Sequence, residues 1–583
     1  MPHVITQSCC GDASCVYACP VNCIHPTPDE AGFATAEMLY IDSVACVDCG
    51  ACVSACPVGA IAPDTRLEAQ QLPFVELNAS FYPARVGKLP PTSKLALVPE
   101  APIVRARPGG PLRVAVVGSG PAAMYAADEL LTQKGVRVNI FEKLPSPYGL
   151  VRGGVAPDHQ STKGVTRLFD KIAARRGLRF YLNVEVGVHV THDELLQHHH
   201  AVLYAVGAPD DRRLEVDGMG LPGTATATEV VAWINGHPEF TDLPVDLSAE
   251  RVIVIGNGNV ALDVARILTA DPNMLARTDI ADHALEALRK SRVREVLIAA
   301  RRRPAASAFT LPELIGLTAG ADVVLDAADR ALVIEDLARE TDSLTRNKLE
   351  ILAGLPDAAR PPTRPRIRFT YNVTPRRVLS EDTAGLVEHT AGPVGDKRAT
   401  GVEFAVTGTE ELRAISAGLV LTSIGYRGKP IRGLPFDEDA AVVPNDGGRV
   451  IDPGSPVPGS PVPGSPVPGS YVAGWIKRGP TGFIGTNKSC AGQTVHNLVA
   501  DFNDGLLADP VHNPAALDRL VRRRRPEVID FAGWKAIDDA EIARGGTQRP
   551  RVKFCTVAAM VEAAAAAPAA PAHRRLLAGL RRG

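Results

Sequence analysis

The sequence predicts a multidomain chain in which a small α+β module is followed by two doubly wound α/β domains. Nine of the eleven cysteines lie before residue 57, which sets the N-terminal part apart from the rest. Two glycine-rich strand–turn–helix patterns follow, near residues 118 and 256. The length of 583 residues suits several hydrophobic cores better than a single one.

The overall composition excludes several classes of protein. A content of 45% hydrophobic and 22% charged residues is typical of a globular protein. The net charge of −2 argues against a polycationic surface for nucleic acid. No run of 18 apolar residues predicts a membrane span, and no apolar segment follows Met1 as in a signal peptide. We therefore expect a cytoplasmic protein that binds neither nucleic acid nor membranes.

The charge is unevenly distributed along the chain. Residues 1–66 contain seven acidic residues and one arginine, a net charge of −6, which leaves +4 for the remainder. This asymmetry indicates an acidic module that docks on a basic face, or two surfaces that are merely solvated.

The cysteines of this module form two related runs. Residues 46–57 read CVDCGACVSACP, the C-x2-C-x2-C-x3-C-P spacing of bacterial iron–sulfur proteins. Residues 9–20 repeat the spacing with aspartate in the second position. In such runs the fourth cysteine ligates the other cluster. The predicted ligands are Cys19, Cys46, Cys49 and Cys52 for a [4Fe–4S] cluster, and Cys9, Cys15 and Cys56 for a second cluster.

The second cluster has an unusual ligand set, because Asp12 stands where a thiolate is expected. A hard oxygen is a weak substitute for sulfur, so this cluster is either [3Fe–4S] or a [4Fe–4S] cluster completed by Asp12 or Cys10. Cys23 fits neither run and is expected to be structural. Zinc and disulfides are the alternatives, but zinc sites usually have longer spacers, and a reducing compartment disfavours disulfides.

A proline-rich linker is predicted at residues 67–110, and a nucleotide-binding pattern follows it. The apolar run 114–117 leads into G-x-G-x-x-A, formed by Gly118, Gly120 and Ala123, and the next predicted strand ends at Glu142. The glycines allow the backbone to approach a pyrophosphate, and the acid accepts from a ribose hydroxyl, which suits FAD or NAD.

The second pattern repeats the strand and turn at residues 251–261. Here the following strand, 295–300, ends in three arginines instead of an acid. Arginines bind a 2′-phosphate through charge-assisted hydrogen bonds, so this domain is predicted to prefer NADP(H). Further on, residues 453–470 form a Pro-Gly-Ser-Pro-Val repeat that predicts an exposed loop, and the Ala/Pro-rich tail after about residue 558 is expected to be mobile.

Several long segments together carry a resemblance to known families. They are 117–123, 148–159, 256–263, 301–302, 312–313 and 474–482. From about residue 111 to about 556 the chain resembles the adrenodoxin-reductase type of ferredoxin–NADP reductase. Residues 1–66 resemble two-cluster bacterial ferredoxins of the seven-iron type, and the whole chain resembles the actinobacterial fusions of the two.

The resemblance implies a Rossmann-like FAD domain at 111–208 and 421–505, an inserted Rossmann-like NADP domain at 209–420, and a C-terminal segment at 506–583. It implies FAD contacts by Glu142, Leu150, Val186, Trp475, Gly482, Phe483 and Ile484. It implies NADP contacts by Arg212, Asn257, Gly258, Asn259, Val260, Arg301, Arg302, Glu313 and Gly482.

The implied activity is transfer of a hydride from NADPH to FAD and of single electrons to the clusters, with a ferredoxin or another one-electron acceptor protein as the partner. His159 and Asp263 lie in the matched segments and are candidates to orient the nicotinamide or relay a proton; a loop histidine and a helix residue without such a role are the alternative. A flavin subunit dedicated to one terminal enzyme, as in glutamate synthase, and a non-enzymatic redox sensor remain alternative functions.

Overall fold

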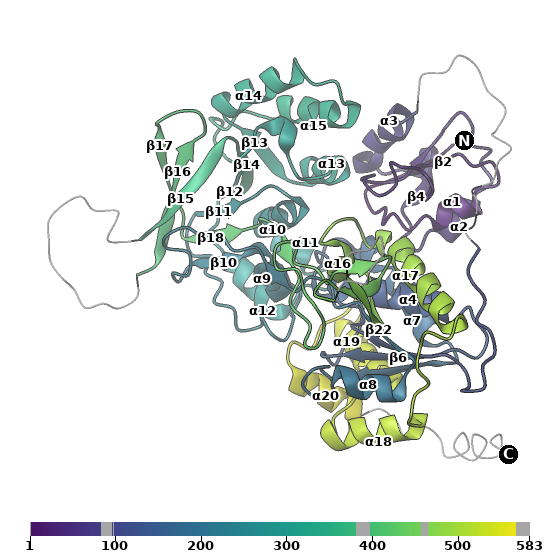
Figure 1. Ribbon diagram of the computed structural model, residues 1–583. Coiled ribbons are helices and arrows are strands. Elements are labelled where there is room, and N and C mark those ends of the chain that lie inside the picture. Colours follow the sequence, from purple (N-terminus) through teal and green to yellow (C-terminus); the bar gives the residue numbers. More distant parts are fainter. Residues whose placement is uncertain are drawn as a thin grey trace.

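The computed structural model describes residues 2–82, 96, 98, 100–380, 397–455 and 464–566. The N-terminal module lies beside helix α13 (Leu311–Gly320) of one large domain and α17 (Thr486–Asn503) of the other (Figure 1). Within these residues, no helix has both the length and the apolar character needed to cross a membrane.

The N-terminal module consists of two short antiparallel strand pairs, β1–β4 and β2–β3, with helices beside them. Its elements are β1 (His3–Ile5), α1 (Ser14–Ala18), β2 (Ile24–His25), β3 (Tyr40–Ile41), α2 (Ala51–Ala55), β4 (Ile61–Pro63), η1 (Asp64–Arg66), η2 (Ala69–Gln71) and α3 (Pro73–Ser80).

Helix α3 corrects the predicted boundary of this module at residue 66. The buried Asn78 side chain accepts a hydrogen bond from the Ile41 N–H at 2.9 Å and donates one to the Ile5 carbonyl at 2.8 Å. It thereby satisfies backbone groups of β3 and β1, so α3 belongs to the module and not to a linker. Residues 83–95 of the predicted linker lie outside the described residues.

The first Rossmann-like domain has a sheet with the order β20-β21-β22-β8-β5-β6-β7, parallel from β22 to β7. Its strands come from both sides of the other domain in sequence, which confirms the predicted insertion. The strands are β5 (Arg113–Val117), β6 (Arg137–Glu142), β7 (Leu178–Leu182), β8 (Ala201–Tyr204), β20 (Asn445–Asp446), β21 (Arg449–Asp452) and β22 (Ser465–Val472). The helices besides α17 are α4 (Pro121–Leu130), α5 (Leu150–Gly153), α6 (Gln160–Lys163), α7 (Thr166–Ala173), α8 (His192–His198) and α16 (Trp475–Arg478).

Strand β22 corrects the prediction that 453–470 is an exposed loop throughout. Ser465 and Pro466 pair with Asp452 and Ile451 of β21, and the side chain of Ser470 is buried. Residues 456–463 lie outside the described part of the chain. Composition alone indicates a loop here, whereas the neighbouring strand provides the pairing that makes a strand.

The second Rossmann-like domain has a parallel sheet with the order β10-β18-β11-β12-β14-β13. Its strands are β10 (Thr224–Thr226), β11 (Arg251–Ile255), β12 (Glu295–Ala299), β13 (Asp322–Leu325), β14 (Arg366–Thr370) and β18 (Leu419–Thr422). Its other helices are α9 (Ala227–Ile234), α10 (Asn259–Thr269), α11 (Pro272–Leu275), α12 (Asp282–Arg289), η3 (Pro304–Ala306), α14 (Ala327–Leu337) and α15 (Ser343–Ala353). An antiparallel sheet, β15 (Val373–Ser380), β16 (Ala399–Val406) and β17 (Leu412–Ser416), lies to one side, and β9 (Asp210–Asp211) pairs with β19 (Tyr426–Arg427).

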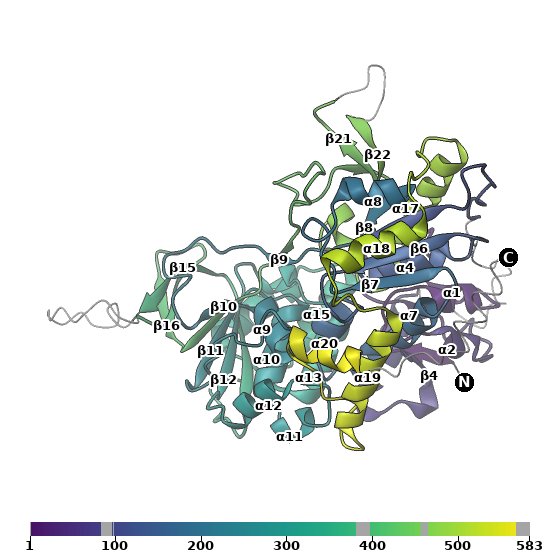
Figure 2. The same ribbon diagram turned by 90° about the horizontal axis from the view of Figure 1, so that it is seen from below.

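The C-terminal segment contacts both large domains: Arg525 donates to the Asn183 carbonyl of the first, and Arg549 donates to Asp282 of the second (Figure 2). It contains α18 (Pro514–Arg524), α19 (Phe531–Gly545) and α20 (Val557–Ala565). Helix α20 corrects the expectation of a mobile tail from about residue 558, because it packs on α19 and buries Met560. Residues 567–583 lie outside the described residues.

Candidate functional site

A cavity of about 460 Å³ opens where the N-terminal module meets both Rossmann-like domains. Thirteen of the residues predicted for nucleotide binding or catalysis line it: Gly118, Gly120, Glu142, Leu150, His159, Asn259, Val260, Asp263, Glu313, Trp475, Gly482, Phe483 and Ile484. The N-terminal module contributes Gln7, Cys9, Cys10 and Glu37.

The first glycine-rich turn forms one end of the cavity. Gly118 follows β5 with φ +95°, and a Cβ there would lie 2.5 Å from the Ala205 carbonyl oxygen. The backbone of Gly149 lies close to Gly120, and a Cβ on Gly149 would lie 3.1 Å from the Cα of Gly120. Helix α4 then begins at Pro121, and the unpaired N–H groups of a helix N-terminus suit a pyrophosphate.

Glu142 ends β6 beside this turn. Its carboxylate accepts hydrogen bonds from the Ser119 hydroxyl at 2.7 Å and from the N–H groups of Ser119 and Leu144 at 3.1 and 3.0 Å. Burial raises the pKa of Glu142, and these donors counteract that rise. The acid is therefore fixed at the position that the fingerprint predicts.

The second glycine-rich turn approaches the same cavity from the other domain. Gly256 has φ +111°, and a Cβ there would overlap the Ser423 carbonyl. Gly258 caps α10, and the side-chain oxygen of Asn259 accepts from the Thr310 N–H at 2.9 Å. This hydrogen bond joins the turn to the start of α13.

Three arginines follow β12, as the sequence predicts, but they have different environments. Arg301 and Arg302 are exposed. Arg303 is held by Asp336 at 2.6 Å and by Glu335 at 3.0 Å. Arg301 and Arg302 are thus better placed than Arg303 to receive a phosphate from solution.

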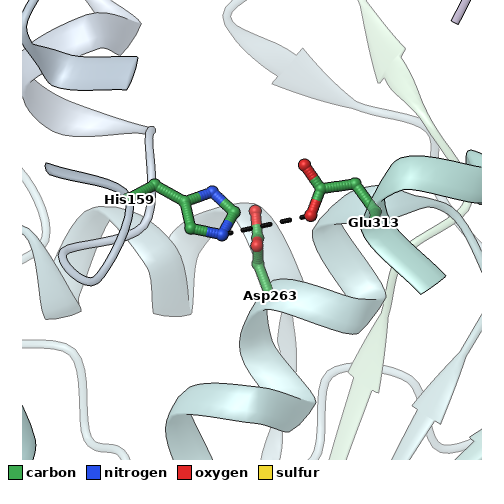
Figure 3. Close-up of side chains that lie close together, drawn as sticks. All are labelled: His159, Asp263 and Glu313. Carbon is green, nitrogen blue, oxygen red and sulfur yellow. Dashed lines mark ion pairs between the residues drawn. The ribbon is translucent and has the colours of Figure 1, made fainter. Parts of the chain in front are cut away.

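His159, Asp263 and Glu313 come from three different elements and converge in the cavity (Figure 3). His159 precedes α6, Asp263 lies on α10, and Glu313 lies in the first turn of α13. The His159 Nε2 atom is 4.0 Å from a Glu313 oxygen, and burial raises the pKa of Glu313. Asp263 in turn accepts from Arg266 at 2.7 Å.

The two cysteine runs adopt the same backbone conformation. Gly11 and Asp48 occupy equivalent positions of the two runs and have φ +69° and +56°; Ala13 and Gly50 are likewise equivalent, with φ +58° and +72°. Each run contains a five-residue helix that is followed by a cysteine with ψ 117°. The repeat in sequence is therefore also a structural repeat.

The four cysteines predicted for the [4Fe–4S] cluster line one small cavity of about 10 Å³, which Cys23 also lines. Cys49 is exposed to solvent. The Sγ of Cys23 lies 3.4 Å from that of Cys19, and this hydrogen bond lowers the pKa of Cys19 to about 6. Cys23 thus contacts Cys19, a predicted cluster ligand. The sequence did not indicate this contact, because Cys23 belongs to neither run.

The second set of cysteines lies toward the large cavity. Cys9 lines it, and the Ala60 N–H donates to the Cys56 Sγ at 3.3 Å. Asp12 is buried and already has partners: it accepts from the Ser14 N–H at 3.2 Å and from the Ser14 hydroxyl, with Lys488 3.8 Å away.

Several polar contacts hold the module against the large domains. On the second Rossmann-like domain, Gln7 donates to Glu313 at 2.9 Å, and Glu37 pairs with Lys348 at 2.5 Å. At the start of α17, the N–H of Gly485, which precedes the helix, donates to the Cys10 carbonyl at 2.7 Å, and Lys488 donates to Ser14 at 2.9 Å. A Cβ on Gly485 would overlap the Asp12 backbone, so glycine allows this close approach. Glu37 of the module thus meets Lys348 of the second domain, an ion pair of the kind expected if the acidic module docks on a basic face.

The remaining residues predicted for nucleotide binding lie outside the cavity lining, and their roles stay predictions. They are Ala123, Val186, Arg212, Asn257, Gly258, Arg301 and Arg302. Ala123 and Val186 pack in hydrophobic cores, and Arg212 binds the Gly425 carbonyl through its N–H. Sequence reasoning missed Gln7, Glu37 and Met560 as lining residues, because no local pattern marks them.

Comparisons with known proteins agree with this two-part organisation. Residues 8–60 match the family model of the 4Fe-4S dicluster domain, and residues 112–309 match that of pyridine nucleotide-disulphide oxidoreductases. The probable ferredoxin/ferredoxin–NADP reductase of Mycobacterium tuberculosis is 70% identical over 100% of this chain and 98% of its own length. That of Mycobacterium leprae is 68% identical over 97% of this chain.

A solved structure, Mycobacterium tuberculosis FprA in complex with NADPH, superposes with a TM-score of 0.68. It is 39% identical and covers 78% of this chain and 100% of its own. The relatives, the two family models and the geometry of the site agree. The chain belongs to the ferredoxin/ferredoxin–NADP reductase family, in which a ferredoxin domain precedes an FprA-like reductase.

Proposed function

We propose that this protein oxidises NADPH with FAD and passes single electrons through two iron–sulfur clusters to a ferredoxin or another one-electron acceptor protein. The observation that carries the proposal is the lining of the large cavity. The first glycine-rich turn, Asn259 and Val260 directly after the second turn, and Cys9 and Cys10 of the ferredoxin module all line it. FAD, when bound, accepts the two electrons of a hydride and releases them one at a time, which is what a pairing of NADPH with iron–sulfur clusters needs.

The first Rossmann-like domain fits FAD. Its turn has Gly118 at a positive φ against the Ala205 carbonyl and open space beside Gly120, which would let a pyrophosphate approach the backbone, and Glu142 is fixed beside the turn. Leu150, Trp475, Gly482, Phe483 and Ile484 line the adjoining wall of the cavity and would contact the rest of the cofactor.

The second Rossmann-like domain fits NADP(H). Its turn at Gly256 and Gly258 would hold the pyrophosphate, and Arg301 and Arg302 are free of the ion pairs that engage Arg303. A relative of this chain, FprA, has been solved in complex with NADPH, which supports the same nucleotide here. His159 and Asp263, with Glu313, would orient the nicotinamide or relay a proton.

The ferredoxin module fits two clusters with different surroundings. Cys19, Cys46, Cys49 and Cys52 would hold a [4Fe–4S] cluster near solvent. Cys9, Cys15 and Cys56 would hold the second cluster beside the large cavity. The side chain of Asp12 is engaged by Ser14 and Lys488, which favours a [3Fe–4S] cluster over ligation by Asp12.

The function is tested by anaerobic mixing with NADPH and with NADH, followed by absorbance. With NADPH, the flavin absorbance and then the cluster absorbance should bleach. Cytochrome c added under the same anaerobic conditions should be reduced. Cys49→Ser should abolish cytochrome c reduction while the flavin still bleaches. Cys555→Ser, whose cysteine belongs to neither predicted cluster and does not itself line the large cavity, should behave as the native protein. Bleaching of the flavin without any change at the clusters would contradict the proposed route.

A further inference from the structure

A side chain of the ferredoxin module reaches into the nucleotide-binding half of the cavity. Gln7 lies just after β1, and its amide donates to a Glu313 carboxylate oxygen at 2.9 Å. The same oxygen is the one that lies 4.0 Å from His159. The two residues are 306 positions apart in sequence, so the contact exists only when the module is seated on the reductase.

Helix α13 provides a notch for this side chain. Gly316 lies one turn after Glu313 on α13, and a Cβ at position 316 would overlap the Gln7 amide. Glycine is unfavourable within a helix relative to alanine, so a glycine there usually has a packing reason. Here the missing Cβ is what admits Gln7.

A second contact fixes the start of the same helix. The Leu311 N–H, in the first turn of α13, donates to Glu37 of the module at 2.6 Å. Cys9, two residues after Gln7, lines the same cavity. Docking of the module therefore does two things at once: it places the second cluster beside the cavity, and it fixes the first turn of α13.

The charged groups around Glu313 leave the amide of Gln7 a clear electrostatic role. His159 and Arg266 favour the carboxylate, Asp263 opposes it, and burial raises the pKa of Glu313. The hydrogen bond from the Gln7 amide favours the charged form of Glu313 and so opposes the rise in pKa that burial causes.

We infer that Gln7 is a positioning residue, supplied by the ferredoxin module, that fixes the Glu313 carboxylate at the nicotinamide end of the cavity. This end of the site is thus complete only when the module is seated. The inference rests on the proposed function for the identity of the nucleotide, but the contact itself belongs to this chain.

The test follows the protonation of Glu313 by infrared spectroscopy of the oxidised holoenzyme without NADPH, with Glu313→Gln to identify its carboxyl band. Gln7→Leu removes a donor to the carboxylate and should raise the midpoint by about one pH unit or more. Gln7→Glu adds a negative charge and should raise it further. The pH profile of flavin reduction by NADPH should move in the same direction and order.

Two glycine variants of α13 separate this role from general damage. Gly316→Ala should displace Gln7 and reproduce the shift of Gln7→Leu. Gly320→Ala, where an added Cβ meets nothing within 4 Å, should leave the midpoint unchanged. An unchanged midpoint in Gln7→Leu with full iron and flavin content would overturn the inference, and Gly316→Ala decides the matter if Gln7→Leu loses iron. Failure of NADPH to bleach the native flavin would instead contradict the proposed function.

Discussion

Replacing Glu37 by leucine should loosen the seat of the ferredoxin module on the second Rossmann-like domain. The Glu37 carboxylate pairs with Lys348 at 2.5 Å and accepts from the Leu311 N–H at 2.6 Å. Its side chain is 17% exposed, and that of Lys348 is 12% exposed. The substitution therefore leaves a largely buried ammonium and a helix N–H without their partner.

The size of the effect follows from this burial. Removing one partner of a buried ion pair costs about 3–5 kcal/mol, and the residual exposure of both side chains places this pair near about 3 kcal/mol. That energy changes the equilibrium between seated and unseated module by about 150-fold. Glu37→Gln keeps an acceptor for Leu311 and loses only the charge, so it should cost about half as much.

Hydrogen exchange of the Leu311 amide, followed by mass spectrometry on the oxidised protein, measures the change. The first N–H groups of a helix have no acceptor within it, so Glu37 is what protects this amide. Exchange should be up to about 150-fold faster in Glu37→Leu, with Glu37→Gln in between. Glu76→Gln, an exposed acid on α3 of the same module, is the matched control. Native-like protection of Leu311 in Glu37→Leu would refute the reasoning.

Three further predictions concern the nucleotide, the iron and the pH. Arg301→Ala and Arg302→Ala should each raise KM for NADPH by about tenfold and leave KM for NADH unchanged, since each removes a charge-assisted hydrogen bond to the 2′-phosphate; an equal loss with both nucleotides would count against that role. Iron analysis should give about seven iron atoms per native chain and about eight after Asp12→Cys, with loss of the three-iron EPR signal, and eight in the native protein would exclude the [3Fe–4S] assignment. Lys553 and Lys163 share the partner Asp279, and burial lowers the pKa of Lys553 to about 7. Between about pH 7 and pH 10 the Lys553 amine is therefore protonated in the unfolded chain but neutral in the folded one. Stability should rise with pH in this range. The free energy of unfolding measured with urea should be higher at pH 9 than at pH 6.5 in the native protein, and this increase should be smaller in Lys553→Met. The same increase in both proteins would contradict the reasoning.

Local chemistry explains which features the sequence predicts correctly. Gly118 and Gly256 have the positive φ that their turns require, and Glu142 ends its strand as the spacing indicates. The cysteine spacing likewise groups four cysteines that together line the small cavity of the ferredoxin module. Each of these features depends on residues within about thirty positions of one another, where spacing and stereochemistry dominate.

The predictions that needed correction depend on neighbours instead. The repeat before Ser470 reads as a loop by composition, but β21 pairs with it. The alanine-rich segment at α20 reads as a mobile tail, but α19 offers a face on which Met560 is buried. Asn78 connects α3 to the ferredoxin module through backbone groups that lie far away in sequence.

By itself, the sequence determined the kinds of site: thiolates at cluster spacing, two nucleotide-binding turns, and arginines where a 2′-phosphate would lie. Only the tertiary structure decided how these sites meet. It places Cys9 and Cys10 in the wall of the nucleotide cavity, and it joins Gln7 to Glu313 across 306 residues. The physical reason is that a motif encodes its own short-range geometry, whereas the docking of one domain on another depends on the shapes and charges of surfaces assembled from distant parts of the chain.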